Sequence, residues 1–191
     1  DEAGAPTGLA VLAMGKLGGG EVNFSSDVDL IFVYDGRGHS DGKRSLDAPS
    51  YFARVAQRLI ALLSERTAEG IVYRVDTRLR PFGSSGPIAV SSAALEGYYE
   101  AHGRAWERYA LIKADWVAPA PTWARALLRR LQPFVYRRYL DFGAFESLRQ
   151  VKADALRGRM NPADRIVGIA VVDIAPENVR VGEPHGAIPH T

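Results

Sequence analysis

The spacing of hydrophobic residues predicts two β-strands separated by a glycine-rich turn near the start of the chain. Residues 8–14 form a continuous apolar run that is too short for a buried helix and is typical of a central strand. Residues 15–20 contain four glycines and interrupt this run. Residues 25–34 begin polar and continue with β-branched and aromatic side chains, which favours a second strand.

An amphipathic helix is predicted next, after a polar loop over residues 35–47. Asp47 is a suitable N-cap, and Pro49 falls in the first turn, where proline is tolerated. The apolar side chains at helical spacing, up to about residue 64, are Phe52, Val55, Leu59, Leu62 and Leu63. We expect this stripe to pack against the sheet.

The remaining pattern predicts one more strand and then helices. Residues 71–78 alternate with period two, and Pro81 would end such a strand because it cannot donate to a ladder. From Ser91 onward the hydrophobic spacing is helical. We expect these helices over about residues 92–101, 104–117, 122–140 and 144–157.

These elements predict an α+β fold, with a sheet flanked by helices and followed by a helical segment. We expect a core over residues 1–90 and a helical segment packed beside it over residues 91–157. Residues 158–191 carry four prolines and no sustained period, apart from a candidate strand over residues 166–175. We therefore expect an atypical, extended or disordered tail.

Composition narrows the classes of function. The chain has 191 residues and no cysteine, which excludes disulfides, thiolate zinc sites and cysteine nucleophiles, and favours a cytoplasmic protein. No apolar run approaches the ~20 residues that cross a bilayer, so we expect no membrane partner. The net charge of +2 does not predict a nucleic-acid partner, which requires clustered basic charge.

Two acids on the second predicted strand are the first candidates for chemistry. Asp27 and Asp29 are two residues apart, so their side chains share a face of the strand. Neighbouring carboxylates repel each other unless a cation lies between them, and Mg²⁺ prefers oxygen ligands. A solvated strand end is the alternative interpretation of this pattern.

Asp76 adds a third acid on the next predicted strand. The side chains of the same parity around it are Arg74, Arg78 and Arg80. This group is either a surface salt-bridge network or a metal ligand beside phosphate-binding guanidiniums. Three acids near a glycine-rich turn match two-metal phosphoryl or nucleotidyl transfer.

The segments 15–18 (Gly-Lys-Leu-Gly) and 26–29 (Ser-Asp-Val-Asp) together resemble the signature of the polymerase-beta-type nucleotidyltransferase superfamily. In that pattern a Gly-Ser turn precedes Asp-x-Asp, and a later strand supplies a third aspartate. Lys16 stands where serine is usual. The resemblance implies a polymerase-beta-like sheet and Mg²⁺, with Mn²⁺ as the other candidate ion.

A narrower resemblance involves residues 14–19, 23–32, 72–83 and 106–110. These segments are similar to bacterial glutamine synthetase adenylyltransferase, a bifunctional family with two related nucleotidyltransferase domains. Asn-Phe-Ser-Ser-Asp and Trp-Glu-Arg-Tyr-Ala resemble the amino-terminal domain, which removes AMP from a tyrosine of glutamine synthetase. The similarity covers roughly residues 8–157. Because a second such domain is absent from this sequence, we expect no adenylylating activity.

The resemblance implies a phosphorolysis, in which inorganic phosphate attacks the AMP phosphorus and releases ADP and tyrosine. The implied partners are glutamine synthetase, a PII-type nitrogen-signalling regulator, nucleotide and phosphate. The alternatives are an ATP-dependent nucleotidyltransferase that adenylylates a protein or small molecule, and a non-catalytic nucleotide-binding regulatory module.

The predicted site residues fall into two groups. The catalytic and metal-binding candidates are Asp27, Asp29 and Asp76. The nucleotide- and phosphate-binding candidates are Gly15, Lys16, Gly18, Gly19, Ser26, Arg78 and Arg80.

Overall fold

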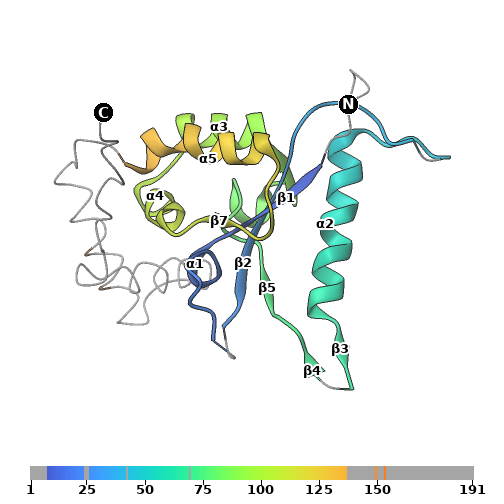
Figure 1. Cartoon of the computed structure of the whole chain (residues 1–191), viewed down its shortest axis with the longest axis horizontal. Helices are drawn as coiled ribbons and strands as arrows, with labels where there is room; N and C mark the ends of the chain where they lie inside the picture. Colours follow the sequence, from blue (N-terminus) through green and yellow to red (C-terminus); the bar gives the residue numbers. More distant parts are fainter. Residues whose placement is uncertain are drawn as a thin grey trace, which may run out of the picture.

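The computed structural model describes residues 8–136 except 24, 25, 42 and 69, together with residues 149 and 153. This part of the chain forms a mixed sheet with helices on both faces, the α+β architecture that the sequence predicted (Figure 1). No helix among the described residues is long and apolar enough to cross a membrane.

Two long antiparallel strands form the centre of the sheet. β1 (Leu9–Ala13) pairs with β2 (Val28–Tyr34), and β7 (Asp115–Trp116) pairs with the other edge of β1. β5 (Val75–Asp76) and β6 (Ala89–Ser91) both run parallel to β2. Because β2 is buried on both faces, it needs an apolar side chain at nearly every position, which its sequence supplies.

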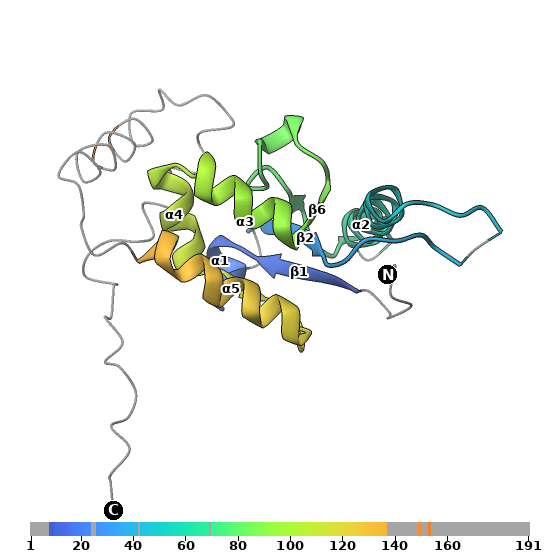
Figure 2. The ribbon, with the colours of Figure 1, turned by 90° about the horizontal axis from the view of Figure 1, so that it is seen from above.

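One face of the sheet is covered by three helices, α3 (Ser92–Ala101), α4 (Ala105–Ile112) and α5 (Thr122–Val135) (Figure 2). Leu12, Ile31 and Val33 of the two central strands pack against these helices in one hydrophobic core. This core contains residues of both the predicted core segment (1–90) and the predicted helical segment (91–157). The helical segment also contributes a strand, β7, to the sheet. The proposed boundary near residue 90 stays a prediction.

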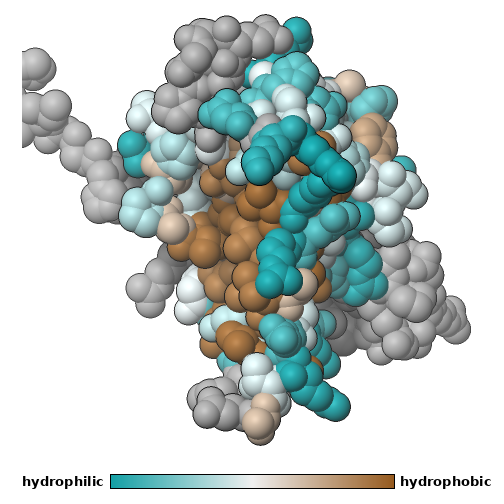
Figure 3. Space-filling model, turned by 90° about the vertical axis from the view of Figure 1, so that its right-hand side faces the viewer, coloured by the Kyte–Doolittle hydropathy of each residue, from teal (hydrophilic) through white to brown (hydrophobic). Residues whose placement is uncertain are grey.

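The other face of the sheet packs against α2 (Ala48–Ser64). The predicted N-cap is confirmed, because Asp47 Oδ1 accepts a hydrogen bond of 3.1 Å from the Ser50 backbone N–H. Phe52 is buried and stacks on Tyr34 of β2, with ring centroids 4.8 Å apart. Figure 3 looks onto this side of the molecule, where an apolar band lies between hydrophilic side chains. The predicted stripe is only partly covered by the sheet, because Phe52 is buried whereas Leu62 is 49% exposed.

The predicted third strand over residues 71–78 is wrong in its extent. The structure has β3 (Arg66–Thr67) and β4 (Gly70–Ile71) as a small hairpin, and β5 comes four residues after it. The residues after Asp76 turn away into a 3₁₀ helix, η1 (Gly83–Ser85). Side chains alternate regularly over residues 71–78, but only Val75 and Asp76 of this segment pair with the edge of β2. The strand is therefore short despite its pattern.

Three helical predictions can be compared with the structure. The helix over 92–101 is confirmed, whereas the one over 104–117 ends at Ile112 and is followed by β7. The helix predicted from residue 122 ends at Val135. The prediction over 144–157 falls mostly outside the described residues, although 149 and 153 are helical, and the tail and its candidate strand lie outside them.

The glycine turn after β1 is tightly packed at Gly18. A Cβ on Gly18 would overlap the main-chain oxygens of Ala13 and Lys113. We predict that Gly18→Ala destabilises the protein by about 1–3 kcal/mol, as overpacking typically does. Gly97→Ala is the matched control, because a Cβ there meets nothing within 4 Å and alanine favours a helix. Thermal unfolding of both variants checks this, and equal melting temperatures would contradict the packing.

Candidate functional site

The site is organised by the pairing of β2 with β5. These strands are parallel, and Asp29 lies directly opposite Asp76 in their register. Residues opposite each other in adjacent strands project to the same face, so the two carboxylates are neighbours. The sequence predicted that Asp76 would join the other acids, and the strand pairing supplies the contact.

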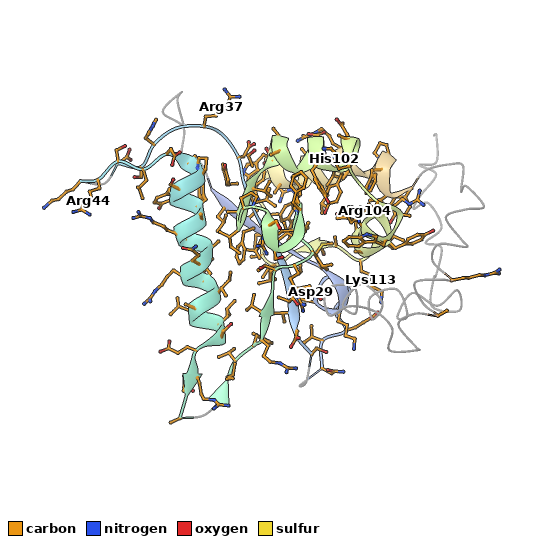
Figure 4. The ribbon with its side chains drawn as sticks, turned by 180° about the vertical axis from the view of Figure 1, so that it is seen from behind. Asp29, Arg37, Arg44, His102, Arg104 and Lys113 are labelled. Atoms are coloured by element: carbon orange, nitrogen blue, oxygen red, sulfur yellow. The ribbon has the colours of Figure 1, made fainter. Side chains whose placement is uncertain are left out.

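Of the three acids, Asp29 is the one whose ionised form is disfavoured by its surroundings. Burial raises the pKa of Asp29, and the negative charges of Asp76 and Asp27 raise it further, to about 7. The positive charge of Arg78 opposes this shift but does not cancel it. The three predicted acids are thus electrostatically coupled, and the pKa of Asp29 is the one that their repulsion raises. Figure 4 labels Asp29 on β2.

Asp76 is buried and is neutralised by an arginine. The Arg78 backbone N–H donates to Asp76 Oδ1 at 2.8 Å, while its side-chain Nε and Nη2 donate to Oδ2 at 2.9 and 2.5 Å. Burial raises the pKa of Asp76, but the hydrogen bonds from Arg78 and the charges of Arg78 and Arg80 outweigh it, so the pKa lies below its ordinary value. Asp76 therefore stays ionised.

Asp27 lies just before β2 and is more exposed than the other two acids. Its Oδ1 is 2.7 Å from Arg74 Nε, and both side chains are largely accessible to solvent. Since Arg74 and Arg78 each pair with an acid, the salt-bridge interpretation of this arginine-rich stretch holds for two of its members. They belong to separate pairs and do not line one strand face.

The backbone of the glycine turn contacts Asp29. It forms a single helical turn, α1 (Gly15–Gly18), and the Met14 N–H before it donates to the Asp29 carbonyl oxygen at 2.9 Å. Gly15 has a φ of +54°, and a Cβ there would lie 3.0 Å from Asp29 Oδ2. Only glycine combines this left-handed conformation with room for the carboxylate.

The other predicted members of the glycine turn have contacts of their own. A Cβ on Gly19 would lie 3.2 Å from Lys113 Cδ, and Gly18 faces the Lys113 main chain, so both fit the turn against the end of α4. Lys16 lies within α1 and is partly buried. Ser26 donates its hydroxyl hydrogen to Asn23 Oδ1 at 2.5 Å.

Arg80 braces the loop that follows β5. Its Nη1 donates to the carbonyl oxygen and the hydroxyl of Thr77, both at 2.8 Å. Its Nε and Nη2 donate to the carbonyl oxygens of Gly86 and Ser84, both at 3.2 Å. The guanidinium of Arg80 is therefore occupied by its own loop, whereas Arg78 lies beside the acids.

Metal binding was predicted from the three aspartates. Among the described residues, no group of three or more acidic, histidine or cysteine side chains is arranged to hold a metal ion. The donors that are present, carboxylate oxygens beside a backbone turn, suit a hard cation such as Mg²⁺. Mg²⁺ sites often use only one or two carboxylates and complete their shell with water and substrate oxygens, so the residues fit an ion of that kind.

The Trp-Glu-Arg-Tyr-Ala motif has a structural role that residue spacing alone did not reveal. Glu107 is buried, and it accepts hydrogen bonds from the Tyr98 hydroxyl at 2.7 Å and the Arg104 backbone N–H at 2.8 Å. It thereby links α3 to the first turn of α4. A glutamate three residues into a helix is the signal that would have found this role.

The raised pKa of Asp29 predicts how the free energy of unfolding changes with pH. Its pKa is raised on folding, so the metal-free protein loses stability as pH rises from about 4 to about 7. Asp29→Asn removes this cost and should stabilise the protein at pH 8 in EDTA by about 1–3 kcal/mol, with no gain near pH 4. Chemical denaturation at both pH values measures it, with the exposed Asp41→Asn as control. An Asp29→Asn protein no more stable than wild type at pH 8 would show that folding does not raise the pKa of Asp29.

Comparison with known proteins identifies the family to which the chain belongs. The family model for glutamate-ammonia ligase adenylyltransferase matches residues 1–130. Three similar relatives are bifunctional glutamine synthetase adenylyltransferase/adenylyl-removing enzymes, from Thioalkalivibrio sulfidiphilus, Stenotrophomonas maltophilia and Shewanella oneidensis. They are 61%, 55% and 54% identical over 153 residues, which is 80% of this chain but 16% of each relative. The chain therefore belongs to the glutamate-ammonia ligase adenylyltransferase family.

Proposed function

We propose that the chain removes AMP from an adenylylated tyrosine of glutamine synthetase by metal-dependent phosphorolysis, with ADP as product. The observation that carries the proposal is the register of Asp29 against Asp76, beside the backbone of Gly15. The names of the relatives support it, since they include an adenylyl-removing activity.

The reaction constrains what the residues must do. An oxygen of inorganic phosphate attacks the AMP phosphorus, the bond from phosphorus to the tyrosine oxygen breaks, and the phenolate leaves and takes a proton from water. The attacking oxygen is already ionised near neutral pH, so no strong general base is required. The difficult steps are bringing two anions together and releasing a phenolate whose conjugate acid has a pKa of ~10.

We assign each of these requirements to particular residues. Asp29, with Asp27 or Asp76 beside it, would hold a Mg²⁺ or Mn²⁺ ion, which supplies positive charge for the AMP phosphate and the leaving oxygen. Arg78 orients Asp76 through its hydrogen bonds, and in this proposal it would also contact the incoming phosphate. Arg80 keeps the loop around Arg78 rigid.

Two other functions share these residues. Transfer of AMP from ATP to a protein or small molecule uses the same acids, and the relatives' names also include adenylyltransferase. It would release pyrophosphate in place of ADP. A non-catalytic nucleotide-binding module is favoured by one observation, that Arg74 and Arg78 already neutralise two of the three acids. A PII-type regulator and a cytoplasmic location stay predictions from the sequence.

The first test is incubation with adenylylated glutamine synthetase, phosphate and Mg²⁺, scored for ADP. Asp29→Asn and Asp76→Asn should each lower the rate about a hundredfold or more, because each removes a carboxylate that would help to hold the cation at the reacting phosphate. Asp41→Asn, a substitution of an exposed loop aspartate, is the control. Absence of ADP here together with pyrophosphate release when ATP is supplied instead, or near-normal turnover by Asp29→Asn, would overturn the proposal.

The second test separates the two arginines. Arg78→Lys keeps the charge but loses the planar fork, so the KM for phosphate should rise about tenfold. Arg80→Lys should mainly lower the melting temperature, because it releases the loop carbonyl oxygens of Thr77, Ser84 and Gly86. Steady-state kinetics with varied phosphate and thermal unfolding measure both effects. An unchanged phosphate KM in Arg78→Lys would remove Arg78 from phosphate binding.

A further inference from the structure

A cavity of about 730 Å³ lies next to the acidic site, and of the predicted site residues only Ser26 lines it. Val22, Asn23 and Ser26 form one wall, and residues 71–74 form the other. The first wall leads from the glycine turn into β2, and the second leads from the β3–β4 hairpin into β5. The cavity therefore lies where the two acid-bearing strands begin.

Two contacts fix the position of the cavity relative to the acids. The Val28 N–H donates to the Arg74 carbonyl oxygen at 2.8 Å, which joins the two walls at their base. Arg74 Nε also pairs with Asp27 Oδ1 at 2.7 Å. Because Arg74 belongs both to the cavity wall and to an ion pair of the acidic site, a molecule in the cavity would border the reacting phosphate.

The wall over residues 71–73 is unusually apolar for an accessible surface. Ile71, Val72 and Tyr73 are consecutive, and they are 43%, 61% and 42% exposed. The β3–β4 hairpin, which ends at Ile71, is exposed as well and projects beyond the sheet (Figure 1). Contiguous exposed apolar side chains on a projecting element mark contact surfaces, and tyrosine and arginine are the residues that contribute most to binding at such surfaces.

The chemistry of the reaction identifies the occupant. The proposed substrate is a phosphodiester attached to a tyrosine within a folded protein, so polypeptide on both sides of that tyrosine must lie close to the acids. A small ligand such as a nucleotide normally occupies an enclosed pocket that buries most of its surface. A cavity walled by a projecting apolar segment suits a length of polypeptide instead.

We propose that Ile71, Val72 and Tyr73, with the cavity beside them, dock the apolar polypeptide flanking the modified tyrosine of glutamine synthetase. This inference rests on the proposed function and adds the surface that selects the protein substrate. Arg74 marks the boundary between the docking surface and the acidic site.

The test compares two matched double variants of the whole chain. Val72→Ser/Tyr73→Ala removes the apolar wall, and Val117→Ser/Tyr51→Ala removes an exposed valine and tyrosine of similar exposure, 53% and 42%, elsewhere. Binding to immobilised adenylylated glutamine synthetase is measured by interferometry, and affinity for a fluorescent AMP analogue is measured with Mg²⁺. We expect the first variant to bind the protein about tenfold more weakly and the control to match wild type.

Each outcome bears on the docking surface. Equal affinities of wild type and Val72→Ser/Tyr73→Ala for the protein overturn the inference, as does a wild-type chain that does not bind glutamine synthetase. A parallel loss of affinity for the AMP analogue assigns the cavity to the nucleotide and also overturns it. If binding weakens as expected but wild type forms no ADP, the proposed reaction fails while the docking surface stands.

Discussion

The structure depends on one strand pairing, the two-residue parallel ladder between β2 and β5. It sets Asp76 opposite Asp29 and fixes Arg74 next to the start of β2. Two residues of ladder are a weak contact by themselves, so the pairing needs support from the surrounding core. That support comes from β1 along the opposite edge of β2 and from α2, whose core includes Val28 and packs against Val75. The hydrophobic core thus holds together carboxylates that repel each other.

The repulsion among the three aspartates affects Asp29 most, because arginines neutralise the other two. Arg78 neutralises Asp76 through several hydrogen bonds, and Arg74 pairs with Asp27 near the surface. Asp29 is more buried than Asp27, and the charge of Arg78 offsets only part of the effect of burial and of the neighbouring acids, so the pKa of Asp29 is raised. A site built in this way is unstable when empty and gains from a cation that approaches Asp29. The docking cavity opens on the side of the site where Arg74 lies, which gives a protein substrate a route to the same acids.

Much of the fold was predictable because long elements have strong patterns. β1 is a continuous apolar run, and α2 and α3 have apolar residues at helical spacing along their length. Both helices also begin at a residue whose side chain caps the first turn, Asp47 and Ser91. The short elements were not predictable. β5, β6 and β7 have two or three residues each, too few to show a period, and they exist because a neighbouring strand offers an unpaired edge. The strand expected over residues 71–78 failed for the same reason, since alternation does not reveal how much partner edge is available.

The sequence by itself determined the central strands, the long helices, the identity of the three acids and the glycine turn, because these follow from local spacing and from residue chemistry. Only the tertiary structure decided which acid meets which cation. Arg78 turns back to Asp76, Arg74 pairs with Asp27 and Arg80 braces its own loop, although all three arginines have the same parity in the sequence. The physical reason is that charge pairing acts through space over a few ångströms. The chain leaves the sheet after Asp76 in a series of turns, so sequence parity no longer fixes where these side chains lie.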